Sequence, residues 1–151
     1  TSEGNRPLQI LRGEISSTGF SAFRVLFMDY PGSHARVRTR DQRASLLIQS
    51  QTPLTGGRFF FARLDADEDD GVRSLKISSA KNRFKAGFGG SSRSIAEPDQ
   101  DWVLPFNAVE ESPGIWRVRS EVVLEPGEYG WYVDLGTGPQ QNGLFSFGVD
   151  Y

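Results

Sequence analysis

The side chains that could support acid–base or nucleophilic catalysis are few in this chain, apart from its carboxylates. Its 151 residues include 19 Asp and Glu but a single histidine, His34, and no cysteine. A Ser-His-Asp triad would have to run through His34, which follows a Pro31-Gly32 turn, and the sequence contains no nucleophile elbow. The missing cysteine excludes a cysteine nucleophile, a disulfide framework and a thiolate metal site. We therefore expect a protein that is not an enzyme.

Pairs of carboxylates leave a hydrolase as the weakest alternative. Asp99 lies two residues before Asp101, and Glu110 directly precedes Glu111. Glycoside hydrolysis needs two carboxyl groups about 5–10 Å apart across a cleft. The sequence does not reveal the distance between two carboxyl groups. A hydrolase would therefore have a site that is not visible in the sequence.

The acidic run over residues 65–70 is the best candidate for a metal site. Its alternate aspartates, Asp65, Asp67 and Asp69, offer the hard oxygen ligands that Ca²⁺ prefers. The EF-hand spacing is not met, because Asp70 takes the place of the required glycine and Lys76 that of the bidentate glutamate. We expect a solvated acidic turn between two strands, with no metal and no other cofactor. Asp65, Asp67 and Asp69 stay a weak candidate site.

Two basic regions suggest contact with an anionic or protein partner. Arg36, Arg38 and Arg40 are predicted to project from one face of a strand over residues 35–39. A glycine-rich segment, 87–92, lies among basic residues within a connection over 79–101, which is long enough to be either functional or poorly ordered. The overall net charge of −2 disfavours nucleic acid as a partner. A solvated strand face and a flexible loop, or a docking surface for another protein, are the preferred interpretations.

Charge is distributed unevenly along the chain. Residues 1–96 contain 15 basic and 9 acidic side chains, whereas residues 97–151 contain 2 and 10. If the two parts of the sequence form separate faces, the domain presents one basic and one acidic surface.

Aromatic residues make up 12% of the chain and raise the alternative of a carbohydrate-binding module. Such modules stack sugar rings on exposed aromatic side chains. Trp102 and Tyr132 are the best candidates, because Tyr132 alternates with Tyr129, Trp131 and Val133 and so faces the other side of its strand. The remaining aromatic residues are expected in the core.

The apolar pattern predicts strands along almost the whole chain. The expected strands cover residues 8–11, 20–29, 35–39, 44–49, 58–65, 72–78, 102–106, 115–122, 130–135 and 144–151. The clearest alternation begins at Ile115 and continues to the end of the chain. The apolar faces that it predicts for the last three strands consist of Trp116, Val118 and Val122, then Tyr129, Trp131, Val133 and Leu135, then Phe145, Phe147, Val149 and Tyr151. One helical turn, near residues 107–111, is the only helix expected. The sequence therefore predicts an all-β antiparallel β-sandwich, immunoglobulin-like, with little or no helix: a flexible tether over 1–6 and a single domain over 7–151.

The segment Leu-Glu-Pro-Gly-Glu-Tyr leads into one of the last strands and is similar to the tyrosine corner of fibronectin type III and immunoglobulin-like sandwiches. By this resemblance Leu124 seals the core, Pro126 and Gly127 make the turn, and the Tyr129 hydroxyl bonds back to the nearby backbone. The corner is therefore expected to be structural.

A broader resemblance links the chain to an uncharacterised group of bacterial, often exported, β domains, which end in a Pro-Gly-Glu-Tyr corner and a Phe-Gly-Val-Asp strand. The matching segments are 60–64, Arg73, 105–106, 114–118, 126–129 and 147–150. The chain departs from the group at 144–146, where a tyrosine and an aspartate are usual. The resemblance implies a fold and an export route but no activity.

These observations favour one function and one location. No stretch approaches the ~20 apolar residues that span a bilayer. The chain starts at Thr1, which fits either a removed leader or a trimmed sequence. A removed leader and a periplasmic or extracellular location are expected from the export route that the resemblance implies. We expect a non-catalytic exported domain that contacts other protein subunits within a larger assembly, which could include a membrane complex. Carbohydrate binding is the alternative.

Overall fold

The computed structural model describes residues 8, 10–18, 25–50, 58–77, 97–134 and 142–150. Regular structure in these residues is strand, apart from one short 3-10 helix, η1 (Gln100–Trp102). The predicted all-β class, with antiparallel pairing and little helix, is confirmed. The expected tether over 1–6, the glycine-rich segment 87–92 and most of the 79–101 connection lie outside the described residues.

The strands vary in length from two residues to the nine residues of the central strand β6. In chain order they are β1 (Ile10–Arg12), β2 (Glu14–Thr18), β3 (Val25–Pro31), β4 (Arg38–Thr39), β5 (Ser45–Gln49), β6 (Phe59–Asp67), β7 (Val72–Ile77), β8 (Val103–Leu104), β9 (Phe106–Ser112), β10 (Ile115–Ser120), β11 (Gly127–Val133) and β12 (Gly143–Val149).

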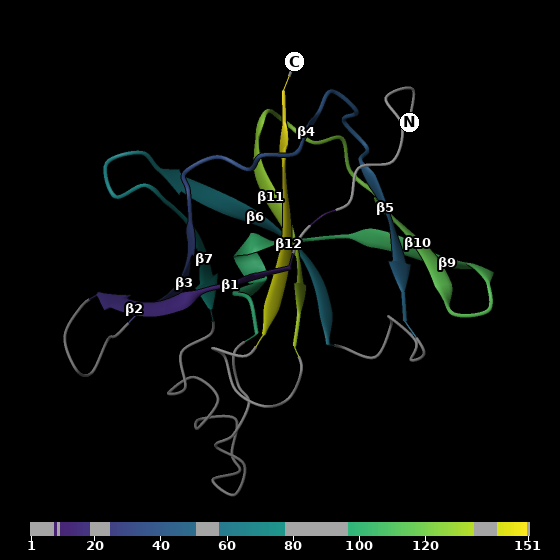
Figure 1. Ribbon diagram of the computed structural model, residues 1–151, viewed down its shortest axis with the longest axis horizontal. Coiled ribbons are helices and arrows are strands. Elements are labelled where there is room, and N and C mark those ends of the chain that lie inside the picture. The colour runs from purple at the N-terminus through teal and green to yellow at the C-terminus, as the bar shows by residue number, and fades with distance from the viewer. Residues whose placement is uncertain are drawn as a thin grey trace, which may run out of the picture.

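The larger sheet curls into a half-barrel. Its strands follow the order β1-β12-β11-β6-β7-β3-β2, with β8 added to β6 and β4 added to β12 in parallel. Its two ends, β1 and β2, are separated in the chain by Gly13 alone, so the path bends back on itself (Figure 1). A Cβ at Gly13 would lie 3.0 Å from Asp29 O, Met28 Cε and Tyr30 Cε1. Glycine therefore lets this crossing strand approach β3 closely.

The smaller sheet, in the order β5-β10-β9, lies on the other side of the central strands β6, β11 and β12 (Figure 1). Between the two sheets is an aromatic core, in which the Phe61 and Trp131 rings stack with centroids 4.1 Å apart. Its buried members are Ala44, Phe59, Phe61, Val118, Leu124, Tyr129, Trp131, Phe147 and Val149. The predicted inward faces of the last strands are those that line this core.

A second core fills the inside of the half-barrel. Its buried members are Met28, Tyr30, Ala62, Leu64, Leu75, Ile77, Tyr132 and Leu144. Because successive residues of a strand point to opposite faces, β6, β11 and β12 contribute alternate side chains to the two cores. These three strands are therefore buried on both faces. Antiparallel sheets more commonly have one face packed on the core and the other in contact with water.

Three predicted elements are wrong. The strand over 35–39 is reduced to β4, and the helical turn near 107–111 is β9, whose Phe106 and Ala108 pack against the aromatic core with a period of two. The strand over 102–106 begins instead as η1, because Asp99 accepts a hydrogen bond from Asp101 N and caps a helical turn. Pro105 then separates β8 from β9, since it has no N–H to donate.

The corner before β11 has the geometry that its sequence predicts. The Tyr129 hydroxyl donates to Glu125 O at 2.7 Å, across four residues of the turn. Leu124 is buried in the aromatic core, and its N–H donates to Gln42 O at 2.7 Å. The corner thus ties the start of β11 to the segment that precedes β5.

We predict that Tyr129→Phe lowers the free energy of unfolding by about 1 kcal/mol, because the Glu125 carbonyl loses its donor. The measurement is urea denaturation. Tyr30→Phe is the matched control: the Tyr30 hydroxyl is buried with no partner among the described residues, so its removal should be neutral or stabilising. Equal losses in both variants would contradict a role for the corner bond.

Candidate functional site

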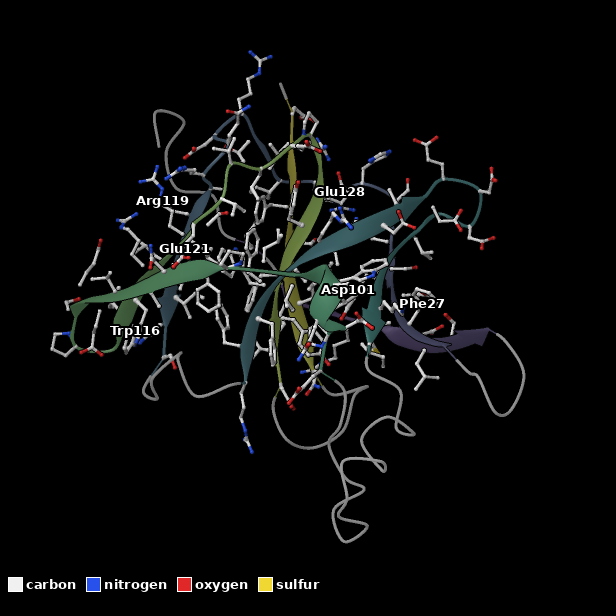
Figure 2. The ribbon with its side chains drawn as sticks, turned by 180° about the vertical axis from the view of Figure 1, so that it is seen from behind. Phe27, Asp101, Trp116, Arg119, Glu121 and Glu128 are labelled. Atoms are coloured by element: carbon white, nitrogen blue, oxygen red, sulfur yellow. The ribbon has the colours of Figure 1, made fainter. Side chains whose placement is uncertain are left out.

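A cluster of charged side chains lies where β4 meets β12 and β11. Glu128 is its most buried member, with a side chain 3% exposed. Its Oε1 accepts from Ala35 N at 2.6 Å and its Oε2 accepts from Arg38 Nη1 at 2.9 Å. Arg38 also donates through Nε and Nη2 to the two oxygens of Asp150, at 2.8 Å each. We call Arg38, Glu128 and Asp150 the Arg38 cluster; Figure 2 shows Glu128 at the start of β11.

Strand register brings the members of the Arg38 cluster together. Gly148 of β12 is the pairing partner of both Arg38 in β4 and Glu128 in β11. A Cβ at Gly148 would occupy the space of the Arg38 guanidinium, so this group lies directly over the glycine. The absence of a side chain at Gly148 therefore makes room for Arg38 between the two carboxylates.

Arg73 of β7 lies in the half-barrel and is 4% exposed. It donates to Gly32 O at 2.9 Å and to Ser146 Oγ at 3.0 Å, while its Nε has no partner among the described residues. Burial lowers the pKa of Arg73, and the nearby Glu128 carboxylate opposes that shift. With Arg38 and Arg73 facing Glu128 and Asp150, the charges of this region balance.

His34 lies at the exposed rim of the Arg38 cluster, with 53% of its side chain accessible. Its Nε2 is 3.1 Å from Glu68 Oε1, and its Nδ1 is 3.6 Å from Glu128 Oε2. Both neighbours are carboxylates, and neither is a nucleophile paired with a base. Glu128 already accepts two hydrogen bonds, so the arrangement is that of a structural ion-pair network.

A shallow groove of about 700 Å³ extends from the Arg38 cluster along the corner. Side chains of both charges and several apolar groups line it, among them Arg63, Asp65, Val123 and Glu125. This mixed lining does not favour a particular class of ligand.

The predicted arginine stripe is not formed. Arg36 precedes β4, and Arg40 follows it, and both are exposed. Arg38 instead points into its cluster, because the carboxylates of Glu128 and Asp150 lie beside β4. The expectation that three arginines share one accessible face is therefore wrong for Arg38.

Of the predicted sugar-stacking pair, Tyr132 is not presented to solvent. Tyr132 is fully buried in the half-barrel core, its hydroxyl accepts from Asn142 Nδ2 at 2.7 Å, and burial raises its pKa to about 12. The prediction of an accessible ring at Tyr132 is wrong, because the face opposite Trp131 lines a second core. Trp102 of η1 is half-buried and packs edge-on against Phe27, with centroids 6.3 Å apart.

The acidic run forms the end of β6 and the turn into β7. Asp67 Oδ1 accepts from Asp70 N at 3.0 Å, and Gly71, with a φ of 66°, completes the turn. Asp65 and Asp69 are exposed. Within the described part of the chain, no group of three or more His, Cys, Asp or Glu residues is arranged to hold a metal ion.

The smaller sheet carries two exposed large apolar side chains on its outward face. Leu47 of β5 and Val109 of β9 lie on either side of Arg117 of β10 and are 42% and 61% exposed. Arg117 forms an ion pair with Glu111. On the inward face, Leu46, Ile48, Phe106, Ala108 and Trp116 are only partly buried. Figure 2 shows Trp116 and Arg119 on this sheet, apart from Glu128.

Both edges of the smaller sheet are open in the described structure. Its order is β5-β10-β9, and neither β5 nor β9 pairs with a further strand among the residues described.

Comparison of the chain with known protein families, curated proteins and solved structures finds no match. Nor does any helix among the described residues have the length and apolar character to cross a membrane. The function must therefore be argued from the geometry.

We predict that Arg38→Ala destabilises the fold by about 3 kcal/mol, because it leaves the Glu128 carboxylate buried without its partner. The measurement is the free energy of unfolding in urea. Arg36→Ala, at an exposed position two residues away, should change this value by less than about 0.5 kcal/mol. Adding Glu128→Gln to Arg38→Ala should recover part of the loss. If Arg38→Ala cost no more than Arg36→Ala, the ion pairs would not stabilise the fold.

We also predict acid-dependent stability from Asp150. Hydrogen bonds from Arg38 lower the pKa of Asp150 below its ordinary value of 3.8. A lowered pKa in the folded state adds stability above the pKa of the unfolded state, and this contribution is lost as the pH falls through the folded-state pKa. The stability difference between the natural protein and Asp150→Asn should therefore shrink below about pH 4. Asp69→Asn controls for the loss of one charge, and a difference that persisted at pH 2 would refute the assignment.

Proposed function

We propose that this chain is a non-catalytic β-sandwich domain that acts by contact with other proteins, as an accessory or structural subunit of a larger assembly. The observation that carries the proposal is the incomplete smaller sheet. Three strands cover the aromatic core from one side, and two of them end the sheet in open edges among the described residues.

The partial burial of the inward side chains supports this proposal. Leu46, Ile48 and Trp116 face the aromatic core but stay partly accessible. Burying apolar surface contributes about 25 cal/mol per Å². A partner protein that covers the accessible parts of these side chains would gain that contribution, which the isolated chain lacks.

The outward face of the same sheet has the composition of a protein interface. Leu47 and Val109 are exposed, and Arg117 lies between them. The buried centre of an interface is more apolar than its rim, and interfaces are enriched in arginine, whose long side chain packs as well as pairs. The two faces and two edges of this sheet thus offer contact surface in a small area.

The alternatives have less support. A hydrolase needs a nucleophile or an activated water beside its base, whereas the groups beside His34 are the carboxylates of Glu68 and Glu128, and Glu128 is held by Arg38 and Ala35 N. A carbohydrate module loses one of its two rings, since Tyr132 is buried. A location outside the cytoplasm of a bacterium belongs to the same proposal and is supported by the resemblance of the corner and the last strand.

We predict that a photo-crosslinking amino acid at position 47 captures a protein in the native cells, whereas the same group at position 69 does not. Position 47 is on the smaller sheet, and position 69 is in the exposed turn between β6 and β7. Adducts are measured by gel shift and identified by mass spectrometry. The absence of any adduct from position 47, in a protein that stays monomeric, would refute contact through this sheet.

A further inference from the structure

We propose that β5 is a pairing edge that accepts β5 of a second copy of this chain. The two strands run antiparallel about a two-fold axis at Leu47, and the smaller sheets join into one sheet of six strands. The inference rests on the proposed function, because it names the partner that contacts the smaller sheet.

The direction of the backbone groups of β5 carries the first step. The pairs Ser120–Ala44 and Gly114–Ser50 extend the β10–β5 register, and in both a β10–β5 hydrogen bond is formed: Ser120 N donates to Ala44 O and Ser50 N to Gly114 O. Bonded and non-bonded pairs alternate in an antiparallel ladder. Even-numbered residues of β5 therefore bond to β10, while the N–H and C=O groups of Ser45, Leu47 and Gln49 point to the open edge.

These outward groups match those of an antiparallel copy. With Leu47 on the axis, Leu47 is opposite Leu47 of the second copy, and Ser45 is opposite Gln49. Each is a pair in which both residues present N–H and C=O groups to the other strand, so each can exchange two hydrogen bonds. An isologous contact requires this self-complementarity.

The side chains of β5 are complementary in the same register. Leu46 becomes the neighbour of Ile48 of the second copy on the inward face, where both side chains are now partly accessible. On the outward face, the exposed Leu47 side chains of the two copies cover each other. Ser45 and Gln49, the polar ends of the strand, lie opposite each other. Pairing therefore buries apolar side chains on both faces and opposes no charges.

Nearby charge favours the antiparallel direction over the parallel one. Arg119 pairs with Ser45 in the sheet and donates to Arg43 O, so both arginines lie at the same end of β5. Antiparallel pairing places them beside the opposite end, Gln49, of the second copy. Parallel pairing would bring four arginine side chains together and is disfavoured by their repulsion.

The other edge of the sheet is protected, whereas β5 is not. On β9, Glu110 and Glu111 are exposed, and the register shift between Ile115 and Trp116 leaves Glu111 as a bulge. Charges and bulges at an edge discourage a further strand. β5 has no charged residue, no proline and no register shift over Ser45–Gln49. Self-pairing through β5 is therefore preferred to pairing through β9.

Proline substitution tests the backbone step. In Leu47→Pro, the lost N–H is one that points to the open edge, so the fold is kept and the intermolecular bonds are lost. Ala108→Pro is the control on the other edge strand, β9. Glu121 N donates to Pro105 O, so the odd-numbered residues of β9 bond to β10 and the Ala108 N–H points to the open edge. Light scattering should give the natural chain and Ala108→Pro about twice the monomer mass, and Leu47→Pro the monomer mass. Circular dichroism verifies that each variant is folded.

Cysteine crosslinking tests the register in the natural fold, which has no cysteine to interfere. Directly opposed residues in a bonded antiparallel pair have Cα atoms about 5.5 Å apart, within the range of a disulfide. Under mild oxidation, Leu47→Cys should convert to a covalent dimer, while Val109→Cys, at the matched position across Arg117, should stay monomeric.

The outcomes separate this inference from the proposed function. A monomeric natural chain, or dimers that persist in Leu47→Pro, would overturn pairing through β5, as would equal crosslinking of the two cysteine variants. If position 47 then captures a different protein in the native cells, contact through the smaller sheet stands without self-pairing. If it captures nothing, both fail.

Discussion

Burial of the central strands on both faces is the constraint on which the rest of this structure depends. β6, β11 and β12 pack aromatic rings such as Trp131 against the smaller sheet, and their alternate residues line the half-barrel. A strand with two buried faces cannot satisfy its polar side chains with water. The half-barrel side therefore combines small residues with paired polar groups. Gly130 leaves room for the Leu144 side chain, and Gly148 leaves room for the Arg38 guanidinium.

The Arg38 cluster follows from that constraint. Glu128 lies on the half-barrel face of β11, so its carboxylate needs partners within the protein. Arg38 and Ala35 N supply them from the segment around β4. Replacing such a buried pair by apolar residues is often neutral, so its presence is weak support for a large gain in stability. The guanidinium lies over Gly148, the residue that pairs with Arg38, so the cluster forms in the observed parallel register of β4 and β12.

The features that were predictable from sequence are those that local pattern determines. Alternation showed which residues of β11 and β12 face the aromatic core, and the corner motif anticipated the Tyr129 bond. The second core was not predictable, because it depends on a curl that closes through Gly13. Tyr132 was consequently expected to be accessible. Arg38 was assigned to a surface stripe because its partners, Glu128 and Asp150, are 90 and 112 residues away. One signal of the cluster was present in the sequence: the glycine at 148 lies opposite the charged Glu128 in the adjacent strand, which leaves space for a partner side chain.

The smaller sheet departs from this constraint, and the departure bears on function. Its strands are buried on one face, and its two edges differ in chemistry. β9 has acidic side chains and a bulge, whereas β5 has a neutral backbone edge with Arg43 and Arg119 near one end. Protection of one edge without the other is hard to explain as a general defence against aggregation, because a single open edge is enough to recruit a strand. It is the arrangement expected if β5 is kept open for a partner.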